Sequence, residues 1–149
     1  MSDPENFDLR QFLPYLLNQA ADAQSLEFGA LYKRDYGMLR TEWRVLFHLG
    51  TYGEMTAREI GLRARVHKTK ISRAVQKLCE KRFVSRSRDP EDRRSEILAL
   101  TPAGLAAYHD LRSVALEYDA ALTRQFSPED AEKLRAMLAV LARLPGPKS

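Results

Sequence analysis

The middle of the chain carries an ordered series of helix and strand signals that restricts the fold more than any other feature. Thr56 and Glu59 have the spacing of a capping box, in which two side chains satisfy free N–H groups at a helix start. The pattern predicts a short helix that ends near Leu62. A tight turn over 63–66 separates it from a second helix over 67–81, whose cationic side chains lie away from its apolar face. Two helices joined in this way indicate a helix-turn-helix.

A β-hairpin is predicted directly after the second helix. The segments 83–86 and 95–100 have the pattern of short antiparallel strands. The segment between them, 87–94, is a polar turn that contains a proline and several charges. Thr101 followed by Pro102 is typical of an N-cap and a first helical position, so a further helix is expected there. The helix-turn-helix is thus followed by a two-stranded wing.

The charge of the chain is concentrated in this central region. The whole sequence carries +4, but thirteen basic and five acidic residues between Arg58 and Arg94 give that segment +8 and leave −4 for the rest. A cationic centre between acidic ends suits a polyanion such as DNA. The alternative is a solvated basic face without a partner.

Apolar residues at steps of three and four predict helices outside this centre as well. Thr41 is a candidate N-cap for a helix that starts at Glu42, and Ser127 followed by proline is the start signal of the last helix. The sequence Pro145-Gly146-Pro147 is expected to end the last helix. The predicted helices cover residues 7–33, 42–49, 102–126 and 128–144.

The apolar stripes of the terminal segments 7–33 and 102–144 are too wide to be buried on the small core of 41–100. A symmetric pair buries identical surfaces in one interface, and we therefore expect a homodimer. The alternative is that the two segments pack only on each other within one chain. We predict one domain over 1–149, mainly α with a small β-hairpin, in which dimerisation helices flank a winged helix-turn-helix lobe at 41–100.

Several motifs of the centre resemble a known family. The sequence resembles the MarR family of winged helix-turn-helix transcriptional regulators, whose wing signature is Asp-x-Arg followed by Leu-Thr-x-x-Gly. The resemblance is sharp over 56–104 and looser toward both ends. It implies a sequence-specific DNA-binding regulator, a ligand-responsive repressor that acts as a homodimer on a pseudo-palindromic operator. The matching residues are Lys68–Arg73, Leu78, Val84–Arg86, and, for the wing signature, Asp92, Arg94, Leu100, Thr101 and Gly104.

The chain departs from the family pattern at Arg82. Such proteins usually carry glycine between the second helix and the first wing strand. Glycine suits a left-handed backbone after a helix, and another residue there costs about 1 kcal/mol or more. We expect that either the helix ends differently or Arg82 tolerates the strain.

A recognition helix presents its N-terminal side chains to the major groove. Lys70 and Arg73 are candidates for donating to guanine and Thr69 for contacting a thymine methyl, with phosphate contacts as the alternative for each lysine. At the wing, Arg93 or Arg94 could enter a narrow minor groove. The resemblance favours Arg94, with Asp92 holding its guanidinium by a charge-assisted hydrogen bond, and a turn cap is the alternative role of Asp92.

The candidates further from the start of the helix are expected to contact the DNA backbone. Gln76 and Lys77 lie one turn further along the helix, and Arg86 and Arg88 either contact phosphate or brace the hairpin. The predicted DNA-binding residues are His67, Lys68, Thr69, Lys70, Ser72, Arg73, Gln76, Lys77, Arg86, Arg88, Asp92, Arg93 and Arg94.

The resemblance also implies an effector, a small aromatic or phenolic acid, in a crevice between the dimer helices and the DNA-binding lobe. Cys79 lies late in the second helix of the helix-turn-helix, which favours an inert buried thiol over a redox switch. Candidate ligand residues, for which plain core or surface positions are the alternative, are Tyr36, Arg40, Trp43, Arg44 and His48.

Other classes of protein lack support in the sequence. No nucleophile elbow, phosphate loop or zinc motif is present, so we expect neither enzyme activity nor a cofactor. The single Cys79 excludes an intrachain disulfide, and three scattered histidines offer no metal-ligand spacing. No apolar run approaches the roughly 18 residues of a membrane span and Met1–Asn6 shows no secretory leader, so a cytoplasmic location is expected. The functional alternative is a winged-helix protein-interaction module without specific DNA binding.

Overall fold

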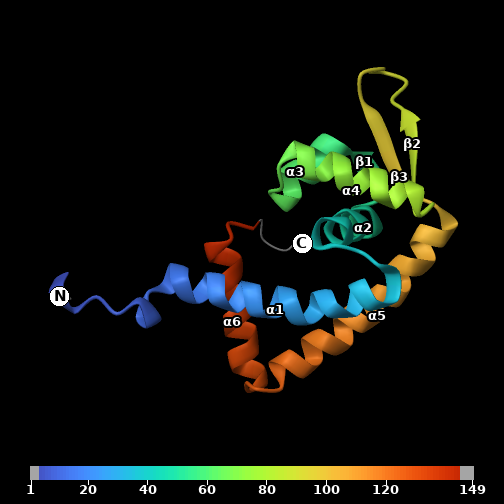
Figure 1. Ribbon diagram of the computed structural model, residues 1–149. Coiled ribbons are helices and arrows are strands. Elements are labelled where there is room, and N and C mark those ends of the chain that lie inside the picture. The colour runs from blue at the N-terminus through green and yellow to red at the C-terminus, as the bar shows by residue number, and fades with distance from the viewer. Residues whose placement is uncertain (1–3, 145–149) are drawn as a thin grey trace. The chain divides into compact units, whose positions relative to one another are not determined.

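The computed structural model describes residues 4–144, so the expectations at Met1–Asp3 and Pro145–Pro147 lie outside the described residues. The chain divides into two units, one ending at Leu111 and the other beginning at Arg112. The predicted fold class, mainly α with a small sheet, is confirmed. The helices (Figure 1) are α1 (Leu13–Tyr36), α2 (Arg40–Tyr52), α3 (Ala57–Ala64), α4 (Lys68–Glu80), α5 (Pro102–Thr123) and α6 (Pro128–Leu141), and the strands are β1 (Met55–Thr56), β2 (Val84–Arg88) and β3 (Glu96–Leu100).

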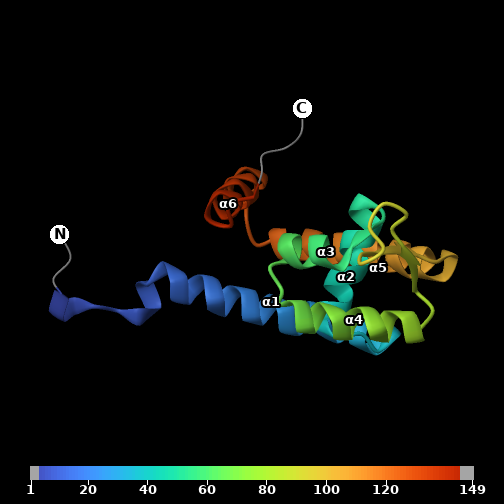
Figure 2. The ribbon, with the colours of Figure 1, turned by 90° about the horizontal axis from the view of Figure 1, so that it is seen from above.

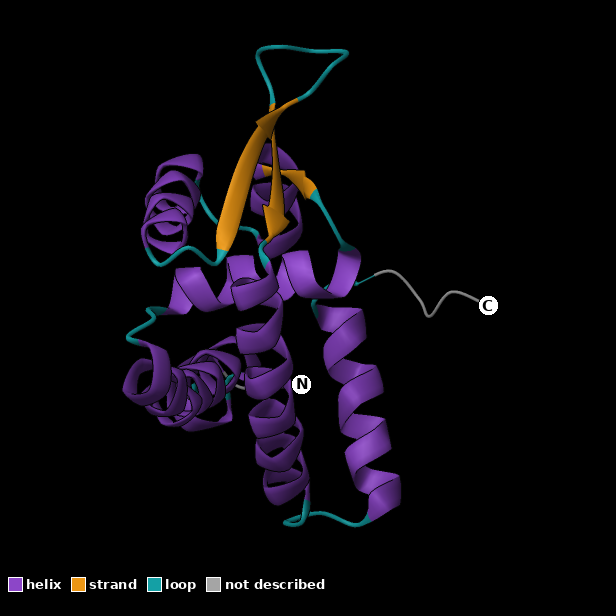
Figure 3. Cartoon of the chain, turned by 90° about the vertical axis from the view of Figure 1, so that its right-hand side faces the viewer, coloured by secondary structure: helices purple, strands orange, loops and turns teal. Residues whose placement is uncertain are grey.

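The sheet has three antiparallel strands in the order β1-β3-β2, where two were predicted. In the hairpin Val84 pairs with Leu100, and on the other edge Met55 pairs with Leu98. The strand β1 was missed because two residues are too short to show an alternating pattern, and because Thr56 also caps α3. Figure 3 shows the hairpin extending beyond the helices of its unit, which places the wing turn in solvent.

The first long helix begins later and ends later than the predicted range 7–33. Pro14 lies in its first turn, because proline lacks an N–H and clashes with the preceding turn anywhere deeper in a helix. A 3-10 turn over Leu9–Gln11 takes the place of the expected first helical turns. The helix ends at Gly37, which has φ 64° and whose N–H donates to the Lys33 carbonyl at 2.8 Å.

The second helix also differs from its prediction at both ends. Thr41 is not its N-cap, because the helix begins one residue earlier and the Glu42 carboxylate accepts the free N–H of Leu39 at 3.2 Å. The helix continues through Gly50, beyond the predicted end at residue 49, and is capped by Gly53. A Cβ at Gly50 would overlap the ring of Tyr108, so this glycine serves close packing rather than helix termination.

One apolar centre joins α2, α3, α4 and the sheet, which lie together at the base of the hairpin (Figures 1 and 2). Leu46, Ile60, Ile71, Leu78 and Leu98 come from these elements and are at most 1% exposed. Each such side chain contributes about 1.5–3 kcal/mol on burial. Because Ile71 and Leu78 lie on one side of α4, the rotation of that helix is fixed and its polar side faces solvent.

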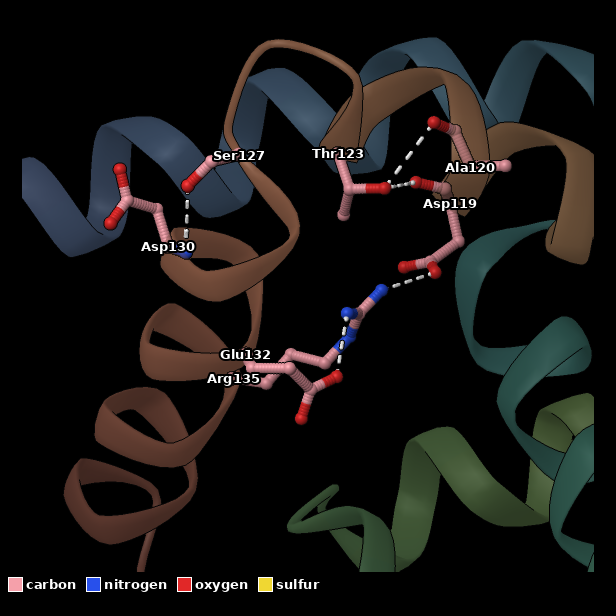
Figure 4. Close-up of polar contacts among 7 residues, drawn as sticks. All are labelled: Asp119, Ala120, Thr123, Ser127, Asp130, Glu132 and Arg135. Carbon is pink, nitrogen blue, oxygen red and sulfur yellow. Dashed lines mark hydrogen bonds and ion pairs between the residues drawn. The ribbon is translucent and has the colours of Figure 1, made fainter.

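In the second unit, α6 begins as predicted and α5 ends earlier than expected. The Ser127 hydroxyl accepts the N–H of Asp130 at 3.1 Å, and the Arg135 guanidinium donates to the Asp119 carboxylate at 2.6 Å (Figure 4). The helix α5 stops at Thr123 instead of Phe126. The last described residue, Leu144, lies beyond the end of α6, so it does not extend the helical stripe as predicted.

Candidate nucleic-acid interface

The helix α4 has a buried side and an exposed, cationic side. Its predicted apolar residues are buried, and the predicted DNA-binding residues on α4 and the wing are all exposed. Lys68, Lys70 and Arg73 make no ion pair with any residue in 4–144. The first half of α4 therefore presents unpaired cations to solvent.

His67 lies just before α4 as its N-cap rather than within its first turn. The ring atom Nδ1 accepts the N–H of Thr69 at 3.2 Å, which satisfies one of the free donors at the helix start. This contact requires an unprotonated Nδ1, so Nε2 carries the ring hydrogen in the neutral form. Any contact of the His67 ring with DNA is thus restricted to its Nε2 edge.

The second half of α4 is tied to the wing through Arg86. The Arg86 guanidinium donates to the Cys79 thiol at 3.3 Å and to the Gln76 amide oxygen at 3.1 Å, and it lies 3.5 Å from the Glu96 carboxylate. The thiol contact, more than the Glu96 charge, holds the pKa of Arg86 above its ordinary value. Of the two roles considered for Arg86, these contacts favour the brace, and Cys79 is half-buried rather than buried as expected.

Two side chains in this half of α4, Gln76 and Lys77, contact the carboxylate of Glu80. Lys77 lies 3.8 Å from the Glu80 carboxylate, and the Gln76 amide donates to it at 3.3 Å. Exposed pairs of this kind contribute little, typically about 0.2–1 kcal/mol. They nevertheless leave Gln76 and Lys77 less available to DNA than the cations of the first half.

At the wing turn, the predicted ion pair between Asp92 and Arg94 is not formed. The Asp92 carboxylate accepts the backbone N–H of Arg94 at 3.1 Å and the Ser95 hydroxyl at 3.3 Å. A carboxylate that accepts the backbone N–H two residues later in the chain closes a short turn. This turn brings that N–H closer to the carboxylate than the guanidinium at the end of the long arginine side chain. Asp92 therefore shapes the turn, and the guanidinium groups of Arg93 and Arg94 make no ion pair within 4–144.

Of the two alternatives considered for Arg82, the structure has the strained backbone. It has φ 62°, and the helix end has the Schellman pattern. The N–H of Phe83 donates to the Leu78 carbonyl and the N–H of Arg82 to the Cys79 carbonyl, both at 2.9 Å. The strain fixes the direction in which the chain leaves α4 and enters the wing.

Thr101 and Gly104 of the wing signature have a structural role at the same junction. The Thr101 hydroxyl donates to the Arg82 carbonyl at 2.6 Å and accepts the N–H of Gly104 at 3.0 Å. A Cβ on Gly104 would overlap the Phe83 carbonyl. The signature therefore holds the start of α5 against the base of the wing.

The five predicted ligand residues do not form one site. Arg40 and Arg44 line a common cleft with Arg65, a residue that sequence analysis missed because no pattern marked it. The His48 ring contacts the Arg44 carbonyl of its own helix, with 2.6 Å between Nδ1 and the oxygen. Trp43 lies instead in an aromatic cluster, stacked on Tyr32 with ring centroids 5.8 Å apart. Its indole N–H is buried and has no hydrogen-bond partner among the described residues.

Tyr36 joins the end of α1 to α5. Its hydroxyl donates to the Asp110 carboxylate at 2.6 Å. Burial, followed by this hydrogen bond, raises the pKa of Tyr36 from 10.0 to about 12. The residue is thus a structural anchor and not part of the cleft that contains Arg40.

No helix within residues 4–144 is long and apolar enough to cross a membrane. The same residues contain no group of histidine, cysteine and acidic side chains arranged to hold a metal ion.

Comparison with known proteins identifies the family. A sequence model of the MarR family matches residues 36–95. An uncharacterised HTH-type transcriptional regulator of Bacillus subtilis, YwoH, is 31% identical over 97 residues, which are 65% of this chain and 70% of that protein.

Solved structures agree with this assignment. A probable transcriptional regulator from Pseudomonas aeruginosa is 26% identical with a TM-score of 0.75, covering 90% of this chain and 99% of that one. A DNA complex of MepR from S. aureus has the same fold at 20% identity, with a TM-score of 0.78 over 90% of this chain and 99% of MepR. The chain belongs to the MarR family of winged helix-turn-helix transcriptional regulators.

Proposed function

We propose that this regulator binds duplex DNA sequence-specifically, as a homodimer on a pseudo-palindromic operator. The observation that carries the proposal is the exposed first half of α4, where Lys68, Lys70 and Arg73 lie opposite a fully buried apolar side and have no acidic partner within residues 4–144. Cations without an acidic partner favour the binding of a polyanion, because each contact with a phosphate releases a condensed counterion from the DNA. MepR, which shares the fold, was solved with DNA.

The two DNA-facing elements read the duplex in different grooves. The start of α4 enters the major groove, where Lys70 or Arg73 donates to guanine and Thr69 contacts a thymine methyl. The wing turn brings Arg94, whose guanidinium has no ion pair within 4–144, to the neighbouring minor groove.

Exposed apolar side chains on α1 and α6 support the dimer. Leu13 and Leu16 are 63% and 41% exposed, and Met137 and Leu141 of α6 are 57% and 56% exposed. The burial of this much apolar helix surface by a second copy of the chain stabilises the protein. We assign dimerisation to the segments 7–33 and 102–144 and DNA binding to 41–100, all within one domain. Sedimentation at micromolar concentration tests this assignment, and a monomer would contradict it.

We further propose that the protein is a repressor in the cytoplasm that a small aromatic or phenolic acid releases from DNA. The support is the aromatic cluster around Trp43, whose buried indole N–H has no partner in the part of the chain that the structure describes and would donate to a polar group on such a molecule. Fluorescence of Trp43, the one tryptophan of the chain, reports occupancy directly.

An electrophoretic shift assay tests DNA binding, using the intergenic duplex upstream of the protein's own gene as probe. We expect Arg94→Ala to weaken binding about tenfold, because it removes a minor-groove cation. Arg34→Ala, which removes one exposed positive charge from outside both the dimerisation and the DNA-binding segments, is the matched control and should bind like the wild type. If the wild type ignores this duplex and random genomic fragments at low salt, the protein-interaction alternative replaces the proposal.

A further inference from the structure

A cleft of about 220 Å³ opens between the start of α2, the turn that joins α3 to α4, and the start of α4. Arg40 and Arg44 line it from α2, Arg65 from the turn and Lys70 from α4, and none of its lining residues is acidic. Pockets for drug-sized ligands usually measure about 300–1,000 Å³. This cleft therefore suits a compact, negatively charged group.

The positive charges of the cleft have no counter-charge. Arg40, Arg65 and Lys70 make no ion pair with any residue in 4–144. The Arg44 guanidinium donates to the Ala64 carbonyl at 3.4 Å and has no acidic partner among the described residues. Burial, and then the charge of Arg40, holds the pKa of Arg44 below its ordinary value. Like charges gathered without an acid raise the free energy of the empty cleft, and a bound anion lowers it.

Arg65 reaches the cleft from a strained backbone. It caps α3 in the left-handed region with φ 55°, where glycine would be the least costly residue. Strain at a residue other than glycine is often found at functional positions. Here the strained residue is one that contributes a guanidinium to the cleft.

We propose that the cleft binds an oxyanion, a phosphate or carboxylate group, through Arg40, Arg44 and Arg65. Guanidinium groups match the paired oxygens of these anions with parallel hydrogen bonds. The oxyanion comes either from a free small molecule or from the DNA backbone. The consequence for regulation rests on the proposed function, since Lys70 both lines the cleft and lies on the DNA-facing side of α4.

Calorimetry with the full-length protein and inorganic phosphate, at ionic strength held constant with sodium chloride, tests the site without DNA. Arg65→Gly removes one guanidinium and suits the left-handed backbone, so it keeps the fold. Arg82→Gly makes the same change at another left-handed arginine that lies outside the cleft. We expect the wild type and Arg82→Gly to bind phosphate equally and Arg65→Gly about tenfold more weakly. Equal affinity of the two variants, or no binding by the wild type, would overturn the inference.

A shift assay with the same two variants identifies the source of the oxyanion. If the DNA backbone supplies it, Arg65→Gly binds the duplex about tenfold more weakly than Arg82→Gly does. If a free anion supplies it, both variants bind the duplex equally, and phosphate releases it from Arg82→Gly but not from Arg65→Gly. A wild type that binds phosphate but no duplex would contradict the proposed function and uphold the oxyanion site.

Discussion

The two halves of α4 differ in how their polar side chains are satisfied. In the first half, Lys68, Lys70 and Arg73 point to solvent without an acidic partner among the described residues. In the second half, Gln76 and Cys79 contact Arg86 of the wing. The helix is thus divided into a free end, with three of its four cations, and a braced end. The difference shows that a basic residue near the DNA-facing surface either contacts DNA or stabilises the fold, and that its contacts within the chain decide between these roles.

At the base of the wing, next to the braced end of α4, the largest effect is expected for Gly104→Ala. The added Cβ overlaps the Phe83 carbonyl at the base of the wing, and the backbone on both sides has to move. We expect a loss of about 3 kcal/mol in the free energy of unfolding, measured by urea denaturation. Ala103→Gly changes the exposed neighbouring residue and should cost no more than about 1 kcal/mol. Equal losses would mean that the wing base is not tightly packed.

Arg73→Ala and Gln76→Ala compare the free and braced ends directly. We expect Arg73→Ala to lower affinity for the mapped operator by about 1–3 kcal/mol, because a free guanidinium contacts a base or phosphate. Gln76→Ala should change affinity by less than about threefold, since its amide contacts Arg86 and Glu80. Titration in a fluorescence anisotropy assay measures both. A larger loss for Gln76→Ala would reverse the assignment of the two ends.

Arg86→Ala tests whether the brace stabilises the fold. The variant loses the contacts to Cys79, Gln76 and Glu96, and we expect about 1 kcal/mol less stability in urea denaturation, because these contacts are partly exposed to water. Arg88→Ala removes the same charge from the same strand, and it loses no ion pair described in 4–144. An equal stability of the two variants would show that the contacts of Arg86 contribute nothing.

The helices of this molecule were largely predictable, and the sites of close contact were not. The buried side of α4 followed from the spacing of Ile71 and Leu78, because a helix repeats its faces every three to four residues. The start of α1 was predictable from Pro14 but was placed too early. The partner of Asp92, a backbone N–H, depends on the path of a turn that no periodicity encodes. The left-handed Arg65 likewise has no signal in the sequence.

The smallest expected effect concerns Tyr36, which braces α1 against Asp110. Its pKa rises from 10.0 to about 12 in the folded chain, so folding favours the protonated hydroxyl. The stabilisation is complete below pH 10 and is lost as the pH rises from 10 toward 12, because the unfolded chain then releases a proton that the folded chain retains. Urea denaturation of the wild type and Tyr36→Phe between pH 9 and about 11.5 measures this, since the other tyrosines cancel in the difference. The difference in stability should shrink across this range, whereas a constant difference would mean that Tyr36 and Asp110 do not share a hydrogen bond in solution.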